Sequence, residues 1–333
     1  MKKFLLFAVA FVAMFATSCV TEDVTVANES ESTVSFCVEA PASVRANVVG
    51  SIYDDGTKAK HLTCAVYDAD WLYLTTVNAT FNDELKATVK IRLVNNKVYN
   101  FVFWAEVEGN QHYIKNLGTT PGQSVTDPTI MVNYGNAVAN DVTRDAFFGK
   151  RFELLVNKSI QETIYLKRPF AQINFGANKD DIAAAEVGGF DMSKAQSEVR
   201  ISAYNTLHFR GVLNSDYDVS GLEVVTFKSA AIPTVDLIAQ SGTAYTWLAM
   251  NYILWPYKED TTSCETLGTC KMWVTDTKNT ASVEVTATMA PANRNWRTNF
   301  LGNLLTDEVT FNVEILPVPE GGFDQTIVPV GRE

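Results

Sequence analysis

Residues Val34 to Val38 read Val-Ser-Phe-Cys-Val, so that every second side chain is strongly apolar. Because successive side chains of a β-strand point to opposite faces, this alternation predicts a strand with one buried face. The same alternation recurs in six further stretches: Leu62 to Val66, Ala87 to Leu93, Val98 to Val102, Ile164 to Phe175, Val283 to Ala287 and Val309 to Ile315. Only one short helix is expected, at Asp180 to Glu186, where acidic residues favour the start and two glycines the end. The pattern predicts an all-β fold of tandem β-sandwiches.

The composition agrees with a folded chain of about two domains. The chain has 333 residues, 47% of them hydrophobic, which is too apolar for a disordered protein. Its formal net charge is −11, and we find no run of Lys and Arg that could form a phosphate-binding patch. A nucleic-acid partner is therefore disfavoured.

The N-terminus is typical of an export signal. Lys2 and Lys3 precede an apolar run from Phe4 to Phe15, which is too short to span a bilayer, and small residues follow it. The motif Ala-Thr-Ser-Cys, ending at Cys19, resembles a bacterial lipobox, in which the Cys thiol is diacylated. We therefore expect residues 1–18 to be a lipoprotein signal peptide; the alternative is an ordinary secretory signal with an incidental Cys.

Beyond the signal, four regions are expected. Residues 19–45 form a lipid-anchored pro-segment that contains the first strand. Residues 46–158 form an N-terminal β-sandwich, and residues 159–333 form a C-terminal β-sandwich. The boundary is placed there because an irregular stretch from Asn133 to Lys150 precedes it and a long new strand, Thr163 to Phe175, follows it.

Four cysteines follow Cys19. Cys264 and Cys270 bracket a short Gly-containing loop, so they either form a local disulfide or remain two unpaired thiols. Cys37 and Cys64 are not expected to pair, because strand phase turns Cys37 away from the core and Cys64 toward it.

Catalytic and metal-binding motifs are scarce. His61, His112 and His208 each lack a neighbouring Cys, His or carboxylate at ligand spacing, and we interpret them as ordinary surface or half-buried residues. No nucleophile elbow, zinc-protease motif or phosphate loop is found. We therefore expect no catalytic residue, no metal and no cofactor, and a protein that is not an enzyme.

Aromatic residues admit two interpretations. They could stack on sugars, but in β-sandwiches such side chains more often fill the core, and we favour the core. The set comprises Trp71, Trp104, Trp247, Trp255, Trp273 and Trp296, with Tyr73, Tyr252 and Tyr257.

Three stretches together resemble the fimbrillins of Bacteroidia, the subunits of type V pili. The first has a strand at Val34 to Val38, the tripeptide Val-Arg-Ala around Arg45, an Asp-Asp-Gly loop and the strand Ala59 to Asp68. The second, Tyr165 to Phe175, looks like the strand that opens the family's second domain. The third and most specific runs from Asn295 to Thr306 and continues into Val309 to Ile315.

The resemblance implies a palmitoylated lipoprotein, attached at Cys19 and exported to the outer membrane. It implies cleavage by an Arg-specific protease between Arg45 and Ala46, two transthyretin-like β-sandwich domains, and polymerisation by strand exchange. The excised strand would carry Val34, Phe36 and Val38.

Two C-terminal segments could donate the replacement strand. Glu308 to Ile315 alternates cleanly, whereas the terminal segment lies beyond a hinge of Pro and Gly. We favour the terminal segment, with the apolar residues Phe323, Ile327, Val328 and Val330, and assign the earlier strand to the second domain's own sheet.

The leading interpretation is therefore a structural subunit of a type V-like fimbria that serves adhesion or colonisation. Its expected partners are other copies of itself or related subunits, the outer membrane through the lipid, and ligands on host or bacterial surfaces. Its expected location is the cell surface, as an outer-membrane lipoprotein or in the fimbrium. The alternatives are a monomeric glycan-binding lipoprotein, a non-cleaved anchor or tip protein, and a secreted hydrolase.

Overall fold

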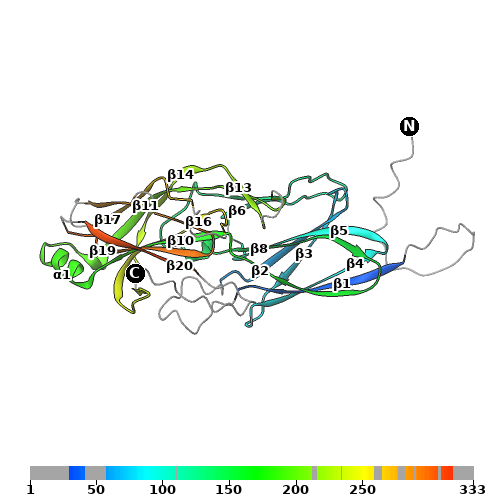
Figure 1. Cartoon of the computed structure of the whole chain (residues 1–333), viewed down its shortest axis with the longest axis horizontal. Helices are drawn as coiled ribbons and strands as arrows, with labels where there is room; N and C mark the ends of the chain where they lie inside the picture. The colour runs from blue at the N-terminus through cyan, green and yellow to red at the C-terminus, as the bar shows by residue number, and fades with distance from the viewer. Residues whose placement is uncertain are drawn as a thin grey trace, which may run out of the picture.

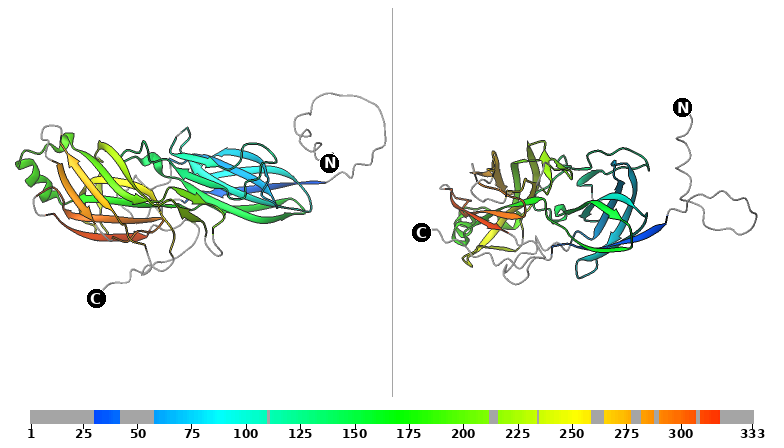
Figure 2. Two further views of the ribbon diagram at one scale, coloured as in Figure 1. Left: turned by 90° about the horizontal axis from the view of Figure 1, so that it is seen from above. Right: turned by 45° about the vertical axis from the view of Figure 1, so that its right-hand side comes forward.

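The computed structural model describes residues 30–41, 58–109, 111–211, 216–233, 235–258, 265–276, 282–287, 290–306 and 309–317. The expected all-β class is confirmed. Figures 1 and 2 show an elongated molecule with its blue and cyan strands at one end and its yellow to red strands at the other. Within the described residues, no helix combines the length and apolar character that crossing a membrane requires.

The N-terminal half is a sandwich of two sheets. The first has the order β4-β1-β9 and the second β3-β2-β5-β8. The core between them contains Phe36, Leu62, Phe101 and Phe103. The strands are β1 (Glu31–Glu39), β2 (His61–Asp68), β3 (Tyr73–Thr80), β4 (Lys86–Val94), β5 (Lys97–Glu106), β8 (Phe147–Val156) and β9 (Ile160–Tyr165).

A third sheet joins the two halves, with the order β13-β12-β7-β6. Its strands are β6 (Tyr113–Asn116), β7 (Thr129–Val132), β12 (Thr206–His208) and β13 (Asp218–Ser220), so that each half contributes two. Trp104 of β5, Ile130 of β7, Leu207 of β12 and Phe175 of β10 (Phe170–Ala177) share one hydrophobic cluster. The apolar core is therefore continuous across the junction.

The C-terminal half is a second sandwich, with sheets ordered β15-β16-β10-β19-β20 and β14-β11-β17-β18. Both faces of β10 and most of both faces of β16 are buried. The remaining strands are β11 (Gln196–Ala203), β14 (Glu223–Ala231), β15 (Asp236–Ile238), β16 (Ala244–Leu254), β17 (Cys270–Thr275), β18 (Ser282–Ala287), β19 (Trp296–Asn303) and β20 (Thr310–Pro317).

The described residues contain three short helical segments: η1 (Val142–Arg144), α1 (Lys179–Val187) and η2 (Met192–Lys194). α1 confirms the helix expected at Asp180 to Glu186. It ends at Gly188 and Gly189, and Gly189 adopts a φ of 98° that glycine tolerates best.

The expectation of one continuous strand from Thr163 to Phe175 is wrong. β9 ends at Tyr165, β10 begins at Phe170, and the two strands belong to different sheets. Pro169 lies between them, and its missing N–H cannot extend a ladder. β9 begins just after the domain limit expected at residue 158, yet it pairs with β1 of the N-terminal half.

Candidate functional site

β1 occupies the centre of its sheet, not an edge. It pairs antiparallel with β4 from Glu31 to Glu39 and parallel with β9 from Val34 to Glu39. In Figure 1 this strand, in blue, runs alongside β4. Removing β1 would therefore leave two unpaired strand edges that face one gap.

The inward face of β1 is completely buried. Val34, Phe36 and Val38 each have 0% exposure, so the expected core face of this strand is confirmed. The Phe36 ring lies 4.9 Å from the ring of Phe101 and 5.3 Å from that of Phe103, edge to face in both cases. At about 1.5–3 kcal/mol for each buried side chain, this face contributes on the order of 5–9 kcal/mol of gross burial.

The outward face of β1 carries polar contacts with β4. Glu39 lies 3.6 Å from Lys86 Nζ, and Glu31 lies 3.1 Å from Arg92 Nη2. Because these pairs are partly exposed, each contributes little stability, about 0–1 kcal/mol. They nevertheless favour one register of β1 against β4.

The C-terminal end of β1 is fixed by two backbone hydrogen bonds. Ala40 donates its N–H to the Leu85 carbonyl at 3.0 Å, and Leu166 donates to the Glu39 carbonyl at 2.8 Å. The expected lipidation site Cys19 and the expected cleavage site at Arg45 and Ala46 lie outside the described residues and stay predictions.

Of the two candidate donor segments, the structure describes the earlier one and not the terminal one. Phe323, Ile327, Val328 and Val330 lie outside the described residues. The strand expected in the second domain's own sheet is observed there as β20, which pairs antiparallel with β19 and forms the edge of the five-stranded sheet.

The cysteines follow the expected strand phase. Cys37 is partly exposed on the outer face of β1 and Cys64 is buried in β2, both with free thiols. Burial raises the pKa of the Cys64 thiol well above its usual range, which keeps it protonated and unreactive. Cys270 is also buried, but Cys264 lies outside the described residues, so the expected disulfide stays a prediction.

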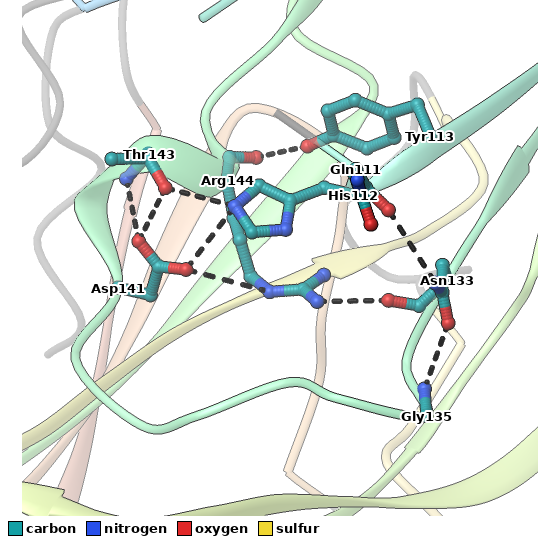
Figure 3. A network of polar contacts seen from close by, with 8 residues as sticks. All are labelled: Gln111, His112, Tyr113, Asn133, Gly135, Asp141, Thr143 and Arg144. Atoms are coloured by element: carbon teal, nitrogen blue, oxygen red, sulfur yellow. Dashed lines mark hydrogen bonds and ion pairs between the residues drawn. The ribbon is translucent and has the colours of Figure 1, made fainter. Parts of the chain in front are cut away.

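His112 belongs to a polar network that sequence spacing did not reveal (Figure 3). Its Nε2 lies 3.2 Å from Asp141 Oδ2 and 2.8 Å from Thr143 Oγ1. Partial burial alone would raise the pKa of Asp141, but hydrogen bonds from His112 and Thr143 outweigh it and hold the pKa at about 2. Arg144, which is almost fully buried, extends the network by donating to the Asn133 carbonyl at 2.8 Å. The network ties the start of β6 to η1 and has a structural role.

His208 likewise has partners far away in the sequence. Its Nδ1 lies 2.7 Å from Asp127 Oδ2, and its Nε2 lies 2.8 Å from Ser220 Oγ. These residues come from β12, β13 and the segment before β7, so the contact reinforces the sheet that joins the halves.

The third histidine, His61, is the first residue of β2. Within the described residues, no group of three or more His, Cys, Asp and Glu side chains could hold a metal ion.

The aromatic residues mostly support the core interpretation. Trp104, Trp247, Trp255 and Tyr252 are at most 1% exposed, and Tyr73 is buried as well. Trp71, Trp273 and Trp296 are half-buried, and Tyr257 is 45% exposed. Trp247, Trp255 and Trp273 therefore do not form one open aromatic platform.

Comparison with sequence families gives one match over most of the chain. A profile described as a family of unknown function, DUF6562, matches residues 24–327. No curated protein sequence matches at a significant level.

Solved structures include similar folds in Bacteroidetes. A candidate cell adhesion protein from Parabacteroides distasonis aligns with a TM-score of 0.50 at 12% identity, over 88% of this chain and 98% of that chain. A candidate polysaccharide-binding protein from Bacteroides thetaiotaomicron aligns with a TM-score of 0.48 at 14% identity, over 87% and 99% of the two chains. The fimbrial anchor protein Mfa2 from Porphyromonas gingivalis aligns with a TM-score of 0.46 at 10% identity, over 86% and 98%. At these identities the likeness concerns the fold alone.

Proposed function

The chain belongs to the family of unknown function DUF6562, and we propose that it is a structural subunit of a type V-like fimbria. In this proposal it is exported as a lipoprotein, attached at Cys19, and cut after Arg45. It then polymerises by β-strand exchange at the cell surface and serves adhesion or colonisation. The role is structural and not catalytic.

The observation that carries the proposal is the position of β1. This strand comes before Arg45 in the chain, pairs on both sides and buries one complete apolar face. Cleavage after Arg45 would leave β1 attached to the body only by non-covalent contacts. Its departure would expose an apolar slot between β4 and β9, lined by Phe101 and Phe103, with open hydrogen-bonding edges on both sides.

Such a slot accepts an extended strand from another chain by β-augmentation. Main-chain hydrogen bonds form on both edges, each with a net value of about 1 kcal/mol, and apolar side chains refill the core. A donor at one end of the subunit and an acceptor slot at the other make a heterologous joint, which propagates into a filament. The elongated shape suits end-to-end assembly (Figure 2).

The fold comparison is compatible with this role, because the Parabacteroides distasonis protein of similar fold is described as a candidate cell adhesion protein. The alternative of a monomeric glycan-binding lipoprotein has weaker support, since Trp104, Trp247 and Trp255 are buried. A non-cleaved anchor or tip protein shares the fold and differs in one respect: β1 stays in place.

The test is to extract the native protein from the cell surface and to determine its N-terminus, its mass and its electrophoretic ladder without heating. We expect an N-terminus at Ala46 and a ladder of heat-sensitive oligomers. The variant Arg45→Ala should remain an uncut, lipidated monomer, whereas Arg210→Ala, which alters an exposed arginine elsewhere, should assemble normally. A native protein that retains Cys19 and β1 and stays monomeric would contradict the subunit role and favour the anchor or glycan-binding alternatives.

A further inference from the structure

β20 and the residue before it repeat the sequence of β1. Residues 34–39 read Val-Ser-Phe-Cys-Val-Glu, and residues 309–314 read Val-Thr-Phe-Asn-Val-Glu. Four of the six positions are identical, and the Ser-to-Thr difference at the second position is conservative. The identical pairs are Val34 with Val309, Phe36 with Phe311, Val38 with Val313 and Glu39 with Glu314.

The two segments differ in how well they are packed. β1 has partners on both sides, whereas β20 lies at a sheet edge and, within the part of the chain that the structure describes, pairs only with β19. Val34 and Val38 are 0% exposed, but Val309 and Val313 are 36% and 42% exposed. The apolar side chains of this pattern are therefore fully buried in β1 but only partly buried where they recur at β20.

We propose that β20 of one copy is the donor strand that replaces β1 in the next copy. This inference rests on the proposed strand exchange and identifies its donor. In the register set by the sequence repeat, Phe311 enters the position of Phe36 between Phe101 and Phe103. Val309 and Val313 then occupy the positions of Val34 and Val38.

The charges support the same register. In the uncut chain Lys86 of β4 lies 3.6 Å from Glu39. When β20 takes the place of β1, Glu314 stands where Glu39 stood and faces the same lysine. Thr310 and Asn312 fall on the outer face, in the positions of Ser35 and Cys37, where polar side chains remain in water.

The exchange gives β20 more contacts than it loses. It gives up one ladder, to β19, and gains two, to β4 and β9. It loses the Phe311 ring contact with Phe300 at 5.6 Å and two hydrogen bonds to Glu314, from Asn299 Nδ2 at 2.9 Å and from the Gln240 N–H at 2.7 Å. In return, Phe311 gains two aromatic neighbours, and both half-exposed valines become buried, which favours the joint.

The terminal segment suits this slot less well. Residues 323–330 read Phe-Asp-Gln-Thr-Ile-Val-Pro-Val and lack the Val-x-Phe-x-Val pattern. Pro329 has no N–H, and a strand with ladder partners on both sides needs that donor wherever it falls. We therefore assign β20, and not the terminal segment, as the donor.

The decisive experiment uses the full chain cut after Arg45 by limited trypsin digestion, with β1 released. Fluorescent peptides of residues 306–317 and 323–330 are titrated against the cut and the uncut protein. We expect the 306–317 peptide to bind the cut protein at least tenfold more tightly than the 323–330 peptide. Neither peptide should bind the uncut protein, in which β1 fills the slot. The Phe311→Ala version of the peptide should lose at least tenfold in affinity, which tests the aromatic pocket without altering the fold of the protein.

Two variants extend the test to whole subunits. Phe311→Ala should reduce assembly of the cut protein at least tenfold, whereas Phe323→Ala should leave assembly unchanged. Binding of the 323–330 peptide alone, or loss of assembly only in Phe323→Ala, overturns the assignment of β20 while strand exchange itself stands. A cut protein that has lost β1, binds neither peptide and stays monomeric would overturn the proposed function as well.

Discussion

Arg168 and Asp145 form a bidentate ion pair, with 2.7 Å between Nε and Oδ1 and 2.8 Å between Nη2 and Oδ2. Both side chains are at most 4% exposed, and the guanidinium also donates to Asn295 Oδ1 at 3.0 Å. Asp145 precedes β8 of the N-terminal half, and Asn295 precedes β19 of the C-terminal half. The ion pair, together with the bond to Asn295, therefore links segments of the two sandwiches.

Asp145→Asn should destabilise the chain by about 3–5 kcal/mol, because removing one partner leaves a buried charge uncompensated. Urea unfolding followed by tryptophan fluorescence measures this loss. Glu284→Gln, which removes one member of the exposed Lys271–Glu284 pair, is the matched control and should have little effect on the unfolding transition. Equal effects of the two changes would show that the buried Arg168–Asp145 pair stabilises the fold no more than an exposed pair does.

Phe36→Ala should lower the free energy of unfolding of the uncut protein by about 3–5 kcal/mol, because it empties a buried aromatic site between Phe101 and Phe103. Cys37→Ala changes the neighbouring side chain on the outer face of the same strand and should have an effect near zero. Thermal unfolding of both variants gives the comparison. If Cys37→Ala is the more damaging change, the assigned inner face of β1 is wrong.

Cys64 should report whether the β1 slot is filled. It lies in β2, in the same core cluster as Phe36 and opposite Phe103, and burial raises the pKa of its thiol. We expect maleimide to leave Cys64 unmodified in the uncut protein, to label it once β1 has been released, and to be blocked again in polymers. Mass spectrometry of tryptic peptides identifies the labelled residue. Cys270, which is buried in β17 far from the slot, should stay unlabelled throughout; parallel labelling of both thiols would indicate general unfolding instead.

Asp141 should make the free energy of unfolding depend on pH, so that the protein is less stable in acid. Its pKa is about 2 in the folded chain against 3.8 for an ordinary Asp, so folding favours the ionised form. The resulting stabilisation, on the order of 1–2 kcal/mol, is fully present above about pH 4 and is lost as the pH falls toward 2. Asp141→Asn should therefore be less stable than the parent at pH 7 and nearly equal to it at pH 2. A stability difference that stays constant from pH 7 to pH 2 would exclude this role.

The sequence predicts β1 and β20 well because alternation over five to seven residues is a local property that needs no partner. It does not predict that β9 pairs with β1, since Val34 and Ile160 are far apart in the chain and parallel pairing leaves no local signal. The short strands of the joining sheet, such as Thr206–His208, are too brief for a pattern. The His112–Asp141 and Arg168–Asp145 contacts are likewise products of tertiary structure. For the candidate site, the sequence therefore predicts the buried strand β1. It does not predict that β1 is the central strand of its sheet.

Gly302 offers a way to loosen β20 without altering β20 itself. In β19 it lies opposite Phe311, and a Cβ placed there would come within 2.0 Å of the Thr310 carbonyl oxygen and 2.6 Å of Phe311 Cα. Gly302→Ala should therefore push β20 away from β19, at a cost of about 1–3 kcal/mol for overpacking. If leaving β19 limits the exchange, the cut protein should assemble roughly tenfold faster, because about 1.4 kcal/mol corresponds to a factor of ten in rate. Light scattering measures the initial rate of assembly.

Gly135→Ala is the matched control, because the nearest atom to the new Cβ lies 3.4 Å away, and this variant should assemble at the parent rate. A folded Gly302→Ala protein that assembles at the parent rate would show that release of β20 from β19 does not limit assembly.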